Sequence, residues 1–439
     1  TLRVPLTRWV QDKLDGKLFG MRGYPRRAVG PETFTPTNVT QLLLFVGKPT
    51  EDHQFDVERI VAAGEVTPPT ALVTDAEPFL PFIDTFGQYK HRDWPGKVHS
   101  VEELQQRRAQ EARELEGQPG PGDRCPYGGW SAGPTLKATG FFRTEKHGGK
   151  WWLVDPDGHL FWSHGIDCVG SLNVTPVEER LDWFEDYPGA RPEFEGFVRT
   201  AYTLKGHYAG RRPQCFSFAG ANLLRKYGPD WETVYPGVVH PRLRSWGLNT
   251  IANWSDRRIA LMRRTPYTDT IGSHGARLIE GSEGYWGKFP DVYDAGFGKT
   301  LRHAMKSKKG GSANDPWCIG YFSDNEMSWG DDTSLAVGAL KSPPDQPAKA
   351  AFIEDLKSKY GDIGLLNNAW GTAHESWEAL RESCEAPDKE RARADLVAFY
   401  RRTAATYFRT VRDIICEVAP HQLYLGCRFA RVNDEAAKV

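Results

Sequence analysis

Three apolar segments of the chain end in polar side chains that could carry out acid–base chemistry. The three polar clusters are Ser163–Asp167, Asn253–Asp256 and Ser323–Glu326. The third cluster follows the apolar run Trp317–Phe322 and leads directly into Met327–Gly330. An apolar wall raises the pKa of a carboxylic acid, so a glutamic acid beside it can hold a proton near neutral pH and deliver it to a leaving oxygen. Glu326 is therefore a candidate general acid; alternatively, Asp324 and Asn325 cap the following loop and Glu326 is a surface charge.

The elements that must position these clusters alternate between strand and helix. Apolar strands are predicted at Leu160–Gly165, Asn249–Trp254, Pro266–Ile271, Trp317–Phe322 and Leu423–Phe429. Helices are predicted near His240–Trp246, Gln346–Tyr360 and Asp388–Val418, and a short meander precedes the first strand. Five apolar strands separated by helices indicate an α/β fold with a parallel sheet buried on both faces. An open doubly wound sheet and a (β/α)8 barrel both fit, although no G-x-G-x-x-G follows the first strand, which excludes a nucleotide-binding version.

The chain is predicted to contain three regions. Residues 1–78 are strand-like and suit a partial β-sandwich, with Gln41–Val46 as one short apolar run. Residues 79–140 form a connector, in which an irregular aromatic segment precedes a helix at Ser100–Gly117 that opens with a capping box. Residues 141–439 hold the predicted sheet and its helices.

Composition narrows the class of function. The 56 Lys and Arg balance 57 Asp and Glu, which argues against a nucleic-acid binder that relies on positive charge. No apolar run approaches the roughly 20 residues that a membrane-spanning helix needs. The seven cysteines show no C-x-x-C pair or zinc-like spacing, so we predict neither a disulfide framework, nor a metal, nor another cofactor. The 15 Trp suggest carbohydrate binding, because indole faces pack against sugar rings; the alternative is that these indoles fill cores and interfaces.

Five long motifs occur along the chain in a fixed order. They are Phe82–Pro95, Trp151–Cys168, Gly247–Asp256, Gly320–Gly330, and Leu366–Gly371 with Ser376-Trp377. Together they resemble the glycoside hydrolase family 50 β-agarases, over nearly the whole chain from Gln41 onward. The resemblance implies a carbohydrate-binding-like β-sandwich followed by a (β/α)8 TIM barrel. It also implies a retaining hydrolase that cleaves β-1,4-galactosidic bonds of agarose or neoagaro-oligosaccharides, often from chain ends with release of neoagarobiose.

The resemblance assigns roles to individual residues. In that family the acid/base glutamate follows an asparagine at the end of the fourth strand, so Glu326 takes the acid/base role and Asn325 hydrogen-bonds the sugar 2-hydroxyl. Substrate binding is predicted for residues at strand ends and in the connector, namely His164, Asp167, Asn253, Trp254, Asp256, Asp324, Trp329, Tyr89, His91 and Asp93. Helix capping and loop bracing are the alternative for His164, Asp167, Asn253 and Asp256, and packing at the barrel mouth is the alternative for the two tryptophans.

The nucleophile that retention requires is absent from the motifs of this chain. The family places it at the end of strand 7 in a Gly-Glu-Phe-like motif, and the Glu193-Phe194 pair lies far upstream of strand 4. We therefore expect a barrel truncated after about strand 5, completed by a longer polypeptide or by the C-terminal segment as a separate chain. The 439-residue chain by itself is expected to lack agarase activity.

Two other functions stay open at this point. One is a β-galactosidase-like hydrolase on the same barrel, and the other is a non-catalytic carbohydrate-binding fragment. Agarose and its oligosaccharides are the expected partners, with no nucleic acid and no membrane. Because agar lies outside cells, a secreted or periplasmic location is expected, although no signal peptide is visible at Thr1.

Overall fold

The computed structural model describes residues 51–54, 56–61, 79–170, 173–204 and 206–439. These residues divide into two compact units. The connector unit contains the described residues up to Gln106 together with Ser171–Gly228, and the sheet unit contains Arg107–Gly170 and Pro229–Val439. The predicted run Gln41–Val46 lies outside the described residues, so the β-sandwich stays a prediction. No helix within the described ranges is long and apolar enough to cross a bilayer.

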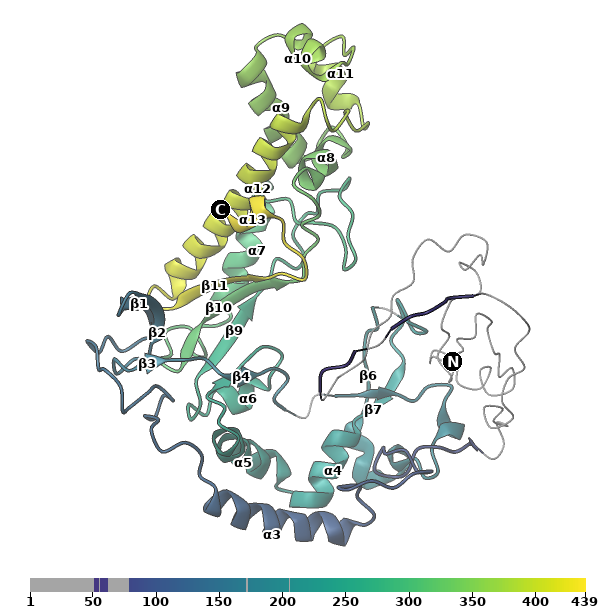
Figure 1. Cartoon of the computed structure of the whole chain (residues 1–439). Coiled ribbons are helices and arrows are strands. Elements are labelled where there is room, and N and C mark those ends of the chain that lie inside the picture. The colour runs from purple at the N-terminus through teal and green to yellow at the C-terminus, as the bar shows by residue number, and fades with distance from the viewer. Residues whose placement is uncertain (1–50, 55, 62–78, 171–172, 205) are drawn as a thin grey trace. The chain divides into compact units, whose positions relative to one another are not determined.

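The sheet unit is built on a five-stranded parallel sheet (Figure 1). Its strands are β4 (Gly165–Ile166), β8 (Thr250–Ile251), β9 (Tyr267–Ile271), β10 (Cys318–Asn325) and β11 (Leu423–Arg428). They pair in the order β11-β10-β9-β8-β4, and every pair is parallel. Within this sheet, each strand lies beside the strand of the same sheet that follows it in the sequence. A doubly wound sheet, by contrast, reverses its strand order at a switch point. The predicted α/β class is confirmed, and closure into a barrel stays a prediction.

Helices cover the sheet and supply most of its core. They are α5 (Trp231–Ser245), α6 (Arg257–Ala260), α7 (Ala295–Lys306), α8 (Ser334–Leu340), α9 (Pro347–Tyr360), α10 (Ile363–Trp370), α11 (Trp377–Glu382), α12 (Arg393–Val418) and α13 (Asp434–Ala437). The α12 helix is amphipathic, and its buried residues pack on α7 and on β10, the longest strand of the sheet. The helices α9, α10 and α11 gather at the end of α12 that is distant from β11 (Figure 1).

An antiparallel meander lies at the amino end of the sheet. Its strands are β1 (Arg143–His147), β2 (Lys150–Val154) and β3 (Leu160–Phe161). Phe142 and Phe161 pack with Ile319 from the start of β10, so the meander covers this end of the sheet. The predicted strand Leu160–Gly165 is wrong as a single element, because β3 pairs back on β2 and the chain enters the parallel sheet only at β4.

The connector unit has its own small core. It contains the strands β5 (Thr175–Pro176), β6 (Val198–Thr200) and β7 (Gln214–Phe216), the helix α4 (Phe218–Tyr227), and the 3-10 turns η3 (Leu181–Trp183), η4 (Pro188–Ala190) and η5 (Pro192–Phe197). Phe82 from the aromatic connector packs with Trp183 and Phe216. Residues of the predicted barrel region 141–439 therefore contribute to this unit. The helix α3 (Val101–Gly117) follows the aromatic segment, as the capping box predicts.

The imidazole of His240 in α5 makes the stability of the sheet unit depend on pH. It is 5% exposed and its Nδ1 lies 2.9 Å from Thr265 Oγ1. Burial, assisted by the charge of Arg264, lowers the pKa of His240 to about 4 from the ordinary value of 6.5. Between these two pH values the unfolded state binds more protons than the folded state, so the free energy of unfolding falls as the pH is lowered through this window.

Replacing His240 by glutamine is expected to flatten this dependence. The loss of stability between pH 7 and pH 4.5 should shrink by about 2 kcal/mol, because one buried group no longer has to be protonated. Urea unfolding at the two pH values measures the change. The exposed His303 on α7 provides the matched control, and His303→Gln should keep the wild-type difference. An unchanged difference in His240→Gln would contradict the assignment.

Candidate active site

The carboxyl ends of the five strands bring the predicted polar clusters to one edge of the sheet. Asp167 follows β4, Asn253 and Trp254 follow β8, and Glu326 follows β10. Parallel strands share the direction of the backbone, so these residues emerge on the same side even though they are far apart in sequence. Cys168 N–H donates a hydrogen bond to the Asn253 carbonyl at 2.9 Å, which ties the first two strand ends together.

Glu326 lies at the end of the longest strand of this sheet. Its backbone N–H donates to the Arg428 carbonyl at 2.9 Å, which continues the β10–β11 pairing by one residue. Its φ of 50° lies in the left-handed region, which non-glycine residues seldom adopt. The side chain is half-buried. Backbone outliers of this kind cluster at functional sites, where neighbouring structure holds them in place.

An indole from the loop after β9 contacts the Glu326 carboxylate. Trp286 Nε1–H donates a hydrogen bond to Glu326 Oε2 at 2.7 Å. The Trp286 side chain is itself 48% exposed, and its ring lies 4.7 Å from that of Tyr285 in an edge-on arrangement. The bond fixes one oxygen of the carboxylate. The position of the Glu326 carboxyl group is therefore set by two elements, β10 and this loop.

Arg428, the last residue of β11, lies among the predicted residues. Its guanidinium carbon is 4.3 Å from the centre of the Trp254 ring. The Asn253 amide, oriented with its oxygen toward Arg428, accepts from the guanidinium. Burial lowers the pKa of Arg428, while the negative charges of Asp167 and Glu326 act in the opposite direction. The structure thus brings Asp167, Asn253, Trp254 and Glu326 together around one cation.

Asn325 pairs with Arg428 across the last rung of β10 and β11. It is half-buried, and its side chain makes no hydrogen bond to another residue in the described part of the chain. Its amide is therefore placed next to Glu326 with its donor and acceptor both available to a ligand. This position is consistent with the predicted role of Asn325, which stays a prediction.

Asp324 is buried, and its carboxylate is hydrogen-bonded to residues of α12 and of the loop after β9. Its carboxylate accepts from Ser273 N–H at 2.8 Å, from the Ser273 hydroxyl at 3.0 Å and from the Tyr407 hydroxyl at 2.7 Å. Burial together with the Asp324 charge raises the pKa of Tyr407 well above its usual range, so this phenol stays a donor. The predicted contact between Asp324 and substrate is contradicted by this burial, since three bonds link the end of β10 to α12 and to the loop after β9.

Trp329 is also buried, contrary to the prediction of a sugar-stacking platform. It is 1% exposed and its ring stacks on Phe408, with centres 5.4 Å apart. Phe289 and Tyr407 meet it edge-on at 4.8 and 5.6 Å. The alternative of packing at the mouth of the sheet is therefore correct for Trp329. Trp254, by contrast, is 56% exposed, and its predicted stacking role stays open.

Two further predicted residues serve local structure. His164 precedes β4, and its N–H donates to the Asn249 side chain at 2.8 Å, which places it at the amino end of the sheet. That position contradicts a substrate contact beside Glu326. Asp256 is 6% exposed and caps α6 by accepting from Arg258 N–H at 2.9 Å. Burial raises its pKa, but the hydrogen bonds and charge of Arg258 outweigh burial and hold it below the usual range, so the capping alternative applies.

Tyr89, His91 and Asp93 belong to the connector unit, while Glu326 belongs to the sheet unit. The rings of Tyr89 and His91 lie 5.6 Å apart, and His91 Nε2 is 2.6 Å from the Phe79 carbonyl. All three residues are exposed. Their predicted role in walling a substrate cleft stays a prediction.

A cluster of Cys125, Asp155 and His159 near the meander was not predicted from spacing. One ligand atom from each lies within 4.8 Å of the others, close enough to hold a metal ion. The Cys125 thiol donates to Asp155 Oδ2 at 2.8 Å, and burial beside this carboxylate raises the pKa of Cys125 to about 12. In this structure these contacts link the loop that carries Cys125 to the turn between β2 and β3.

Sequence reasoning missed Arg428 and Trp286. Arg428 could have been found, because it is a polar residue at the end of an apolar strand, which is the rule that selected Glu326. Trp286 lies in an irregular loop that carries no periodic pattern. Its contact with Glu326 depends on the path of that loop in three dimensions.

The carboxyl group of Glu326 can transfer a proton to a ligand that lies at the carboxyl ends of these strands. Glu326 supplies a carboxyl group held by an indole N–H, and Arg428 supplies positive charge across the same edge. An exposed indole beside such a carboxyl group fits a ligand with apolar faces and hydroxyl edges. These are the features of a sugar-cleaving site.

No protein-family model matches the chain, but two curated proteins and several solved structures are similar to it. It is 32% identical to beta-agarase B of Vibrio sp. (strain JT0107) over 452 residues, which cover 93% of this chain and 46% of that protein. A solved structure described as an exo-beta-agarase has a TM-score of 0.77 and 31% identity, covering 85% of this chain and 57% of that one. The crystal structure of another agarase has a TM-score of 0.76 and 29% identity, covering 82% and 55%. The chain spans about half the length of the curated relatives it matches.

Proposed function

This chain belongs to the family 50 β-agarases, and we propose that it forms part of a retaining glycoside hydrolase that cleaves β-1,4-galactosidic bonds of agarose. In this reaction Glu326 protonates the leaving oxygen and then activates water. Asn325 binds the hydroxyl next to the reacting carbon. Trp254 and Arg428 form the surface on which the neighbouring sugar rests, and Asp167 and Asn253 contact its hydroxyls.

The observation that carries this proposal is the placement of Glu326 after Asn325 at the carboxyl end of β10. A general acid must reach the glycosidic oxygen and stay fixed while the sugar moves. The indole of Trp286 and the β10–β11 pairing provide this fixation. Asp324 and Tyr407 add rigidity from beneath the site. The similarity to agarases is the reason for proposing agarose as the substrate.

We further propose that the sheet is part of a (β/α)8 barrel. The consecutive order of its five parallel strands supports this, since a barrel adds each new strand beside the last. Retention requires a second carboxylate about 5–5.5 Å from the first. The family resemblance implies that this nucleophile lies on a later strand than β11, and we include that position in the proposal.

The mode of attack and the location of the enzyme are parts of the same proposal. Attack from chain ends is supported by the similarity to a solved exo-beta-agarase, and neoagarobiose is the product that the family resemblance implies. Because agarose is a polymer that cannot enter a cell, the enzyme would act in the periplasm or in the medium.

Product analysis on agarose by mass spectrometry tests this function. Neoagarobiose as the first and dominant product supports exo action, whereas a ladder of longer even-numbered oligosaccharides would indicate internal cleavage. Hydrolysis of lactose-type β-galactosides without action on agarose would instead support the β-galactosidase alternative. Proton NMR of the first product reports the anomer, and an inverted anomer would exclude the retaining mechanism.

The hydrogen bond from the Trp286 indole N–H to Glu326 leads to a specific prediction. Trp286→Phe keeps an aromatic ring but removes the donor, and a hydrogen bond to a charged group contributes about 1.5–3 kcal/mol. We expect the kcat on agaro-oligosaccharides to fall by about tenfold with little change in KM, because the bond positions the carboxyl group rather than the sugar. Tyr285→Phe is the matched control, since Tyr285 neighbours Trp286 and is 70% exposed. A rise in KM alone would assign Trp286 to substrate binding instead.

A further inference from the structure

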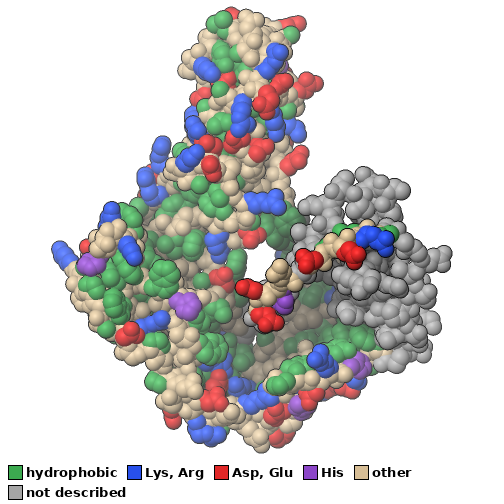
Figure 2. All heavy atoms as spheres, viewed as in Figure 1, with side chains coloured by type: hydrophobic (Ala, Val, Ile, Leu, Met, Phe, Trp, Pro, Cys, Tyr) green, Lys and Arg blue, Asp and Glu red, His purple; other side chains and the backbone are tan. Residues whose placement is uncertain are grey.

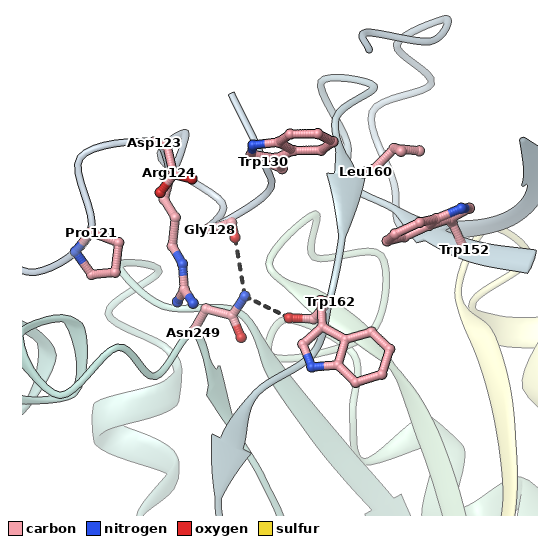
Figure 3. Close-up of a pocket in the computed structure, with 9 residues that line it drawn as sticks. All are labelled: Pro121, Asp123, Arg124, Gly128, Trp130, Trp152, Leu160, Trp162 and Asn249. Atoms are coloured by element: carbon pink, nitrogen blue, oxygen red, sulfur yellow. Dashed lines mark hydrogen bonds between the residues drawn. The ribbon is translucent and has the colours of Figure 1, made fainter. Parts of the chain in front are cut away.

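A pocket of about 410 Å³ opens at the amino end of the central sheet, in the sheet unit (Figure 3). Trp162 precedes β4 and Asn249 precedes β8, so the pocket lies at the end of the strands opposite to Glu326. Asn249 in the pocket and Asn253 at the candidate active site flank β8, and the four residue steps between these positions span about 13 Å at the usual rise per residue. The pocket is therefore distinct from the candidate active site.

Three indoles surround this space. Trp130, Trp152 and Trp162 come from different segments, and Figure 3 shows them around one opening. Trp130 is 45% exposed and Trp162 is 76% exposed, so neither fills a core. Figure 2 shows hydrophobic side chains gathered over β1, β2 and β3, the strands next to the pocket. A concentration of exposed apolar surface on a folded unit marks a binding site more often than a single exposed residue does.

The pocket is held in shape by the side chain of Asn249. Its Nδ2 donates to the Gly128 carbonyl and to the Trp162 carbonyl, both at 3.0 Å (Figure 3). Its Oδ1 accepts from His164 N–H at 2.8 Å. Asn249 is 4% exposed, so these bonds are shielded from water. The loop that carries Gly128 and the segment that carries Trp162 are thereby fixed to the start of β8 before any ligand arrives.

The charge of the residues that line the pocket indicates which kind of ligand it fits. Arg124 and Asp123 supply one positive and one negative group, and the other lining residues are uncharged. A pocket without net charge gives no preference to a phosphate, a sulfate or a cationic ligand. Flat indole faces with a donor and an acceptor beside them match a neutral sugar ring, which has C–H faces and hydroxyl edges.

We propose that this pocket is a second carbohydrate-binding site, which holds a neutral saccharide segment at the amino end of the sheet. The choice of agarose as the polysaccharide rests on the proposed function. A second contact with the same polysaccharide raises the effective concentration of polysaccharide near Glu326, although the contacts at Glu326 itself do not change.

Affinity electrophoresis through gels that contain agarose tests this proposal. All variants carry Glu326→Gln, so that the polymer is bound but not cut. Trp162→Ala and Trp130→Ala should each weaken retention on the order of tenfold, which corresponds to the loss of one stacking contact. Trp162→Tyr, which keeps a flat ring, should restore most of the retention. Trp246→Ala is the matched control, because Trp246 is 63% exposed and does not line the pocket.

Retention by Trp162→Ala and Trp130→Ala equal to that of the parent would overturn the proposal. A lowered unfolding temperature with unchanged retention would also overturn it, and would assign the indoles to packing against another polypeptide segment. Gels with other neutral polysaccharides separate this inference from the proposed function. If the enzyme does not cut agarose but the tryptophan variants lose retention on β-1,4-galactan or laminarin, the second site stands and the agarase assignment falls.

Discussion

In the complete enzyme, in which further strands close the barrel, replacement of Glu326 by glutamine is expected to lower turnover on agarose by about 10²–10⁴-fold, because the amide keeps the shape of the side chain but has no proton to transfer. The hydrogen bond from Trp286 can still form to the amide oxygen, so the loss reports chemistry rather than a displaced side chain. Aryl glycosides with good leaving groups need little protonation, and their first step should be affected far less. Steady-state kinetics on both substrate types measure this difference.

Glu283→Gln is the matched control for this experiment. Glu283 lies on the loop that carries Trp286, its side chain is 88% exposed, and it contacts Lys341 at 3.7 Å. Its replacement should leave turnover within about twofold, since a surface ion pair contributes little. Azide attacks without a general base, so it should raise turnover of the Glu326 variant on aryl glycosides. Wild-type turnover on agarose by Glu326→Gln would show that another group is the acid/base.

Replacement of Trp329 by alanine is expected to lower the free energy of unfolding by about 3–5 kcal/mol. The indole is fully buried between Phe289, Tyr407 and Phe408, so truncation leaves a cavity that these rings cannot fill. Urea unfolding followed by circular dichroism measures the loss.

Trp254→Ala separates packing from sugar binding. Because Trp254 is 56% exposed, its loss should cost less than about 1 kcal/mol of stability but weaken oligosaccharide binding by about 1–3 kcal/mol. Calorimetry with an agaro-oligosaccharide on the Glu326→Gln background measures the affinity. If Trp329→Ala unfolds like the wild type and binds sugar weakly, the burial argument for Trp329 is wrong.

The strands and the acid/base candidate were accessible from the sequence because their determinants are local. The run Trp317–Phe322 is apolar at every position, which predicts a strand buried on both faces, and β10 lies there. Polar residues that follow such a strand must emerge at its carboxyl end, so Glu326 could be placed at an open edge. The capping box at Ser100 similarly predicts the start of α3.

The errors concern residues whose role depends on neighbours distant in sequence. Asp324 and Glu326 are two positions apart, yet Asp324 faces Tyr407 on α12 while Glu326 faces Trp286. The prediction for His164 is wrong because the run from Leu160 to Gly165 is divided between two sheets: β3 pairs with β2, and the parallel sheet begins only at β4, after His164.

The sequence by itself determined the α/β class, the approximate strands and the identity of the acid/base candidate, because periodicity and strand-end position are properties of short segments. Only the tertiary structure decided which polar and aromatic side chains are available to a ligand. Trp254 and Trp329 are the same residue type and follow the carboxyl ends of β8 and β10, but α12 covers the Trp329 indole with Tyr407 and Phe408, whereas the Trp254 indole is 56% exposed. Whether a side chain is buried depends on helices and loops from distant parts of the sequence, and a local sequence pattern cannot predict their positions.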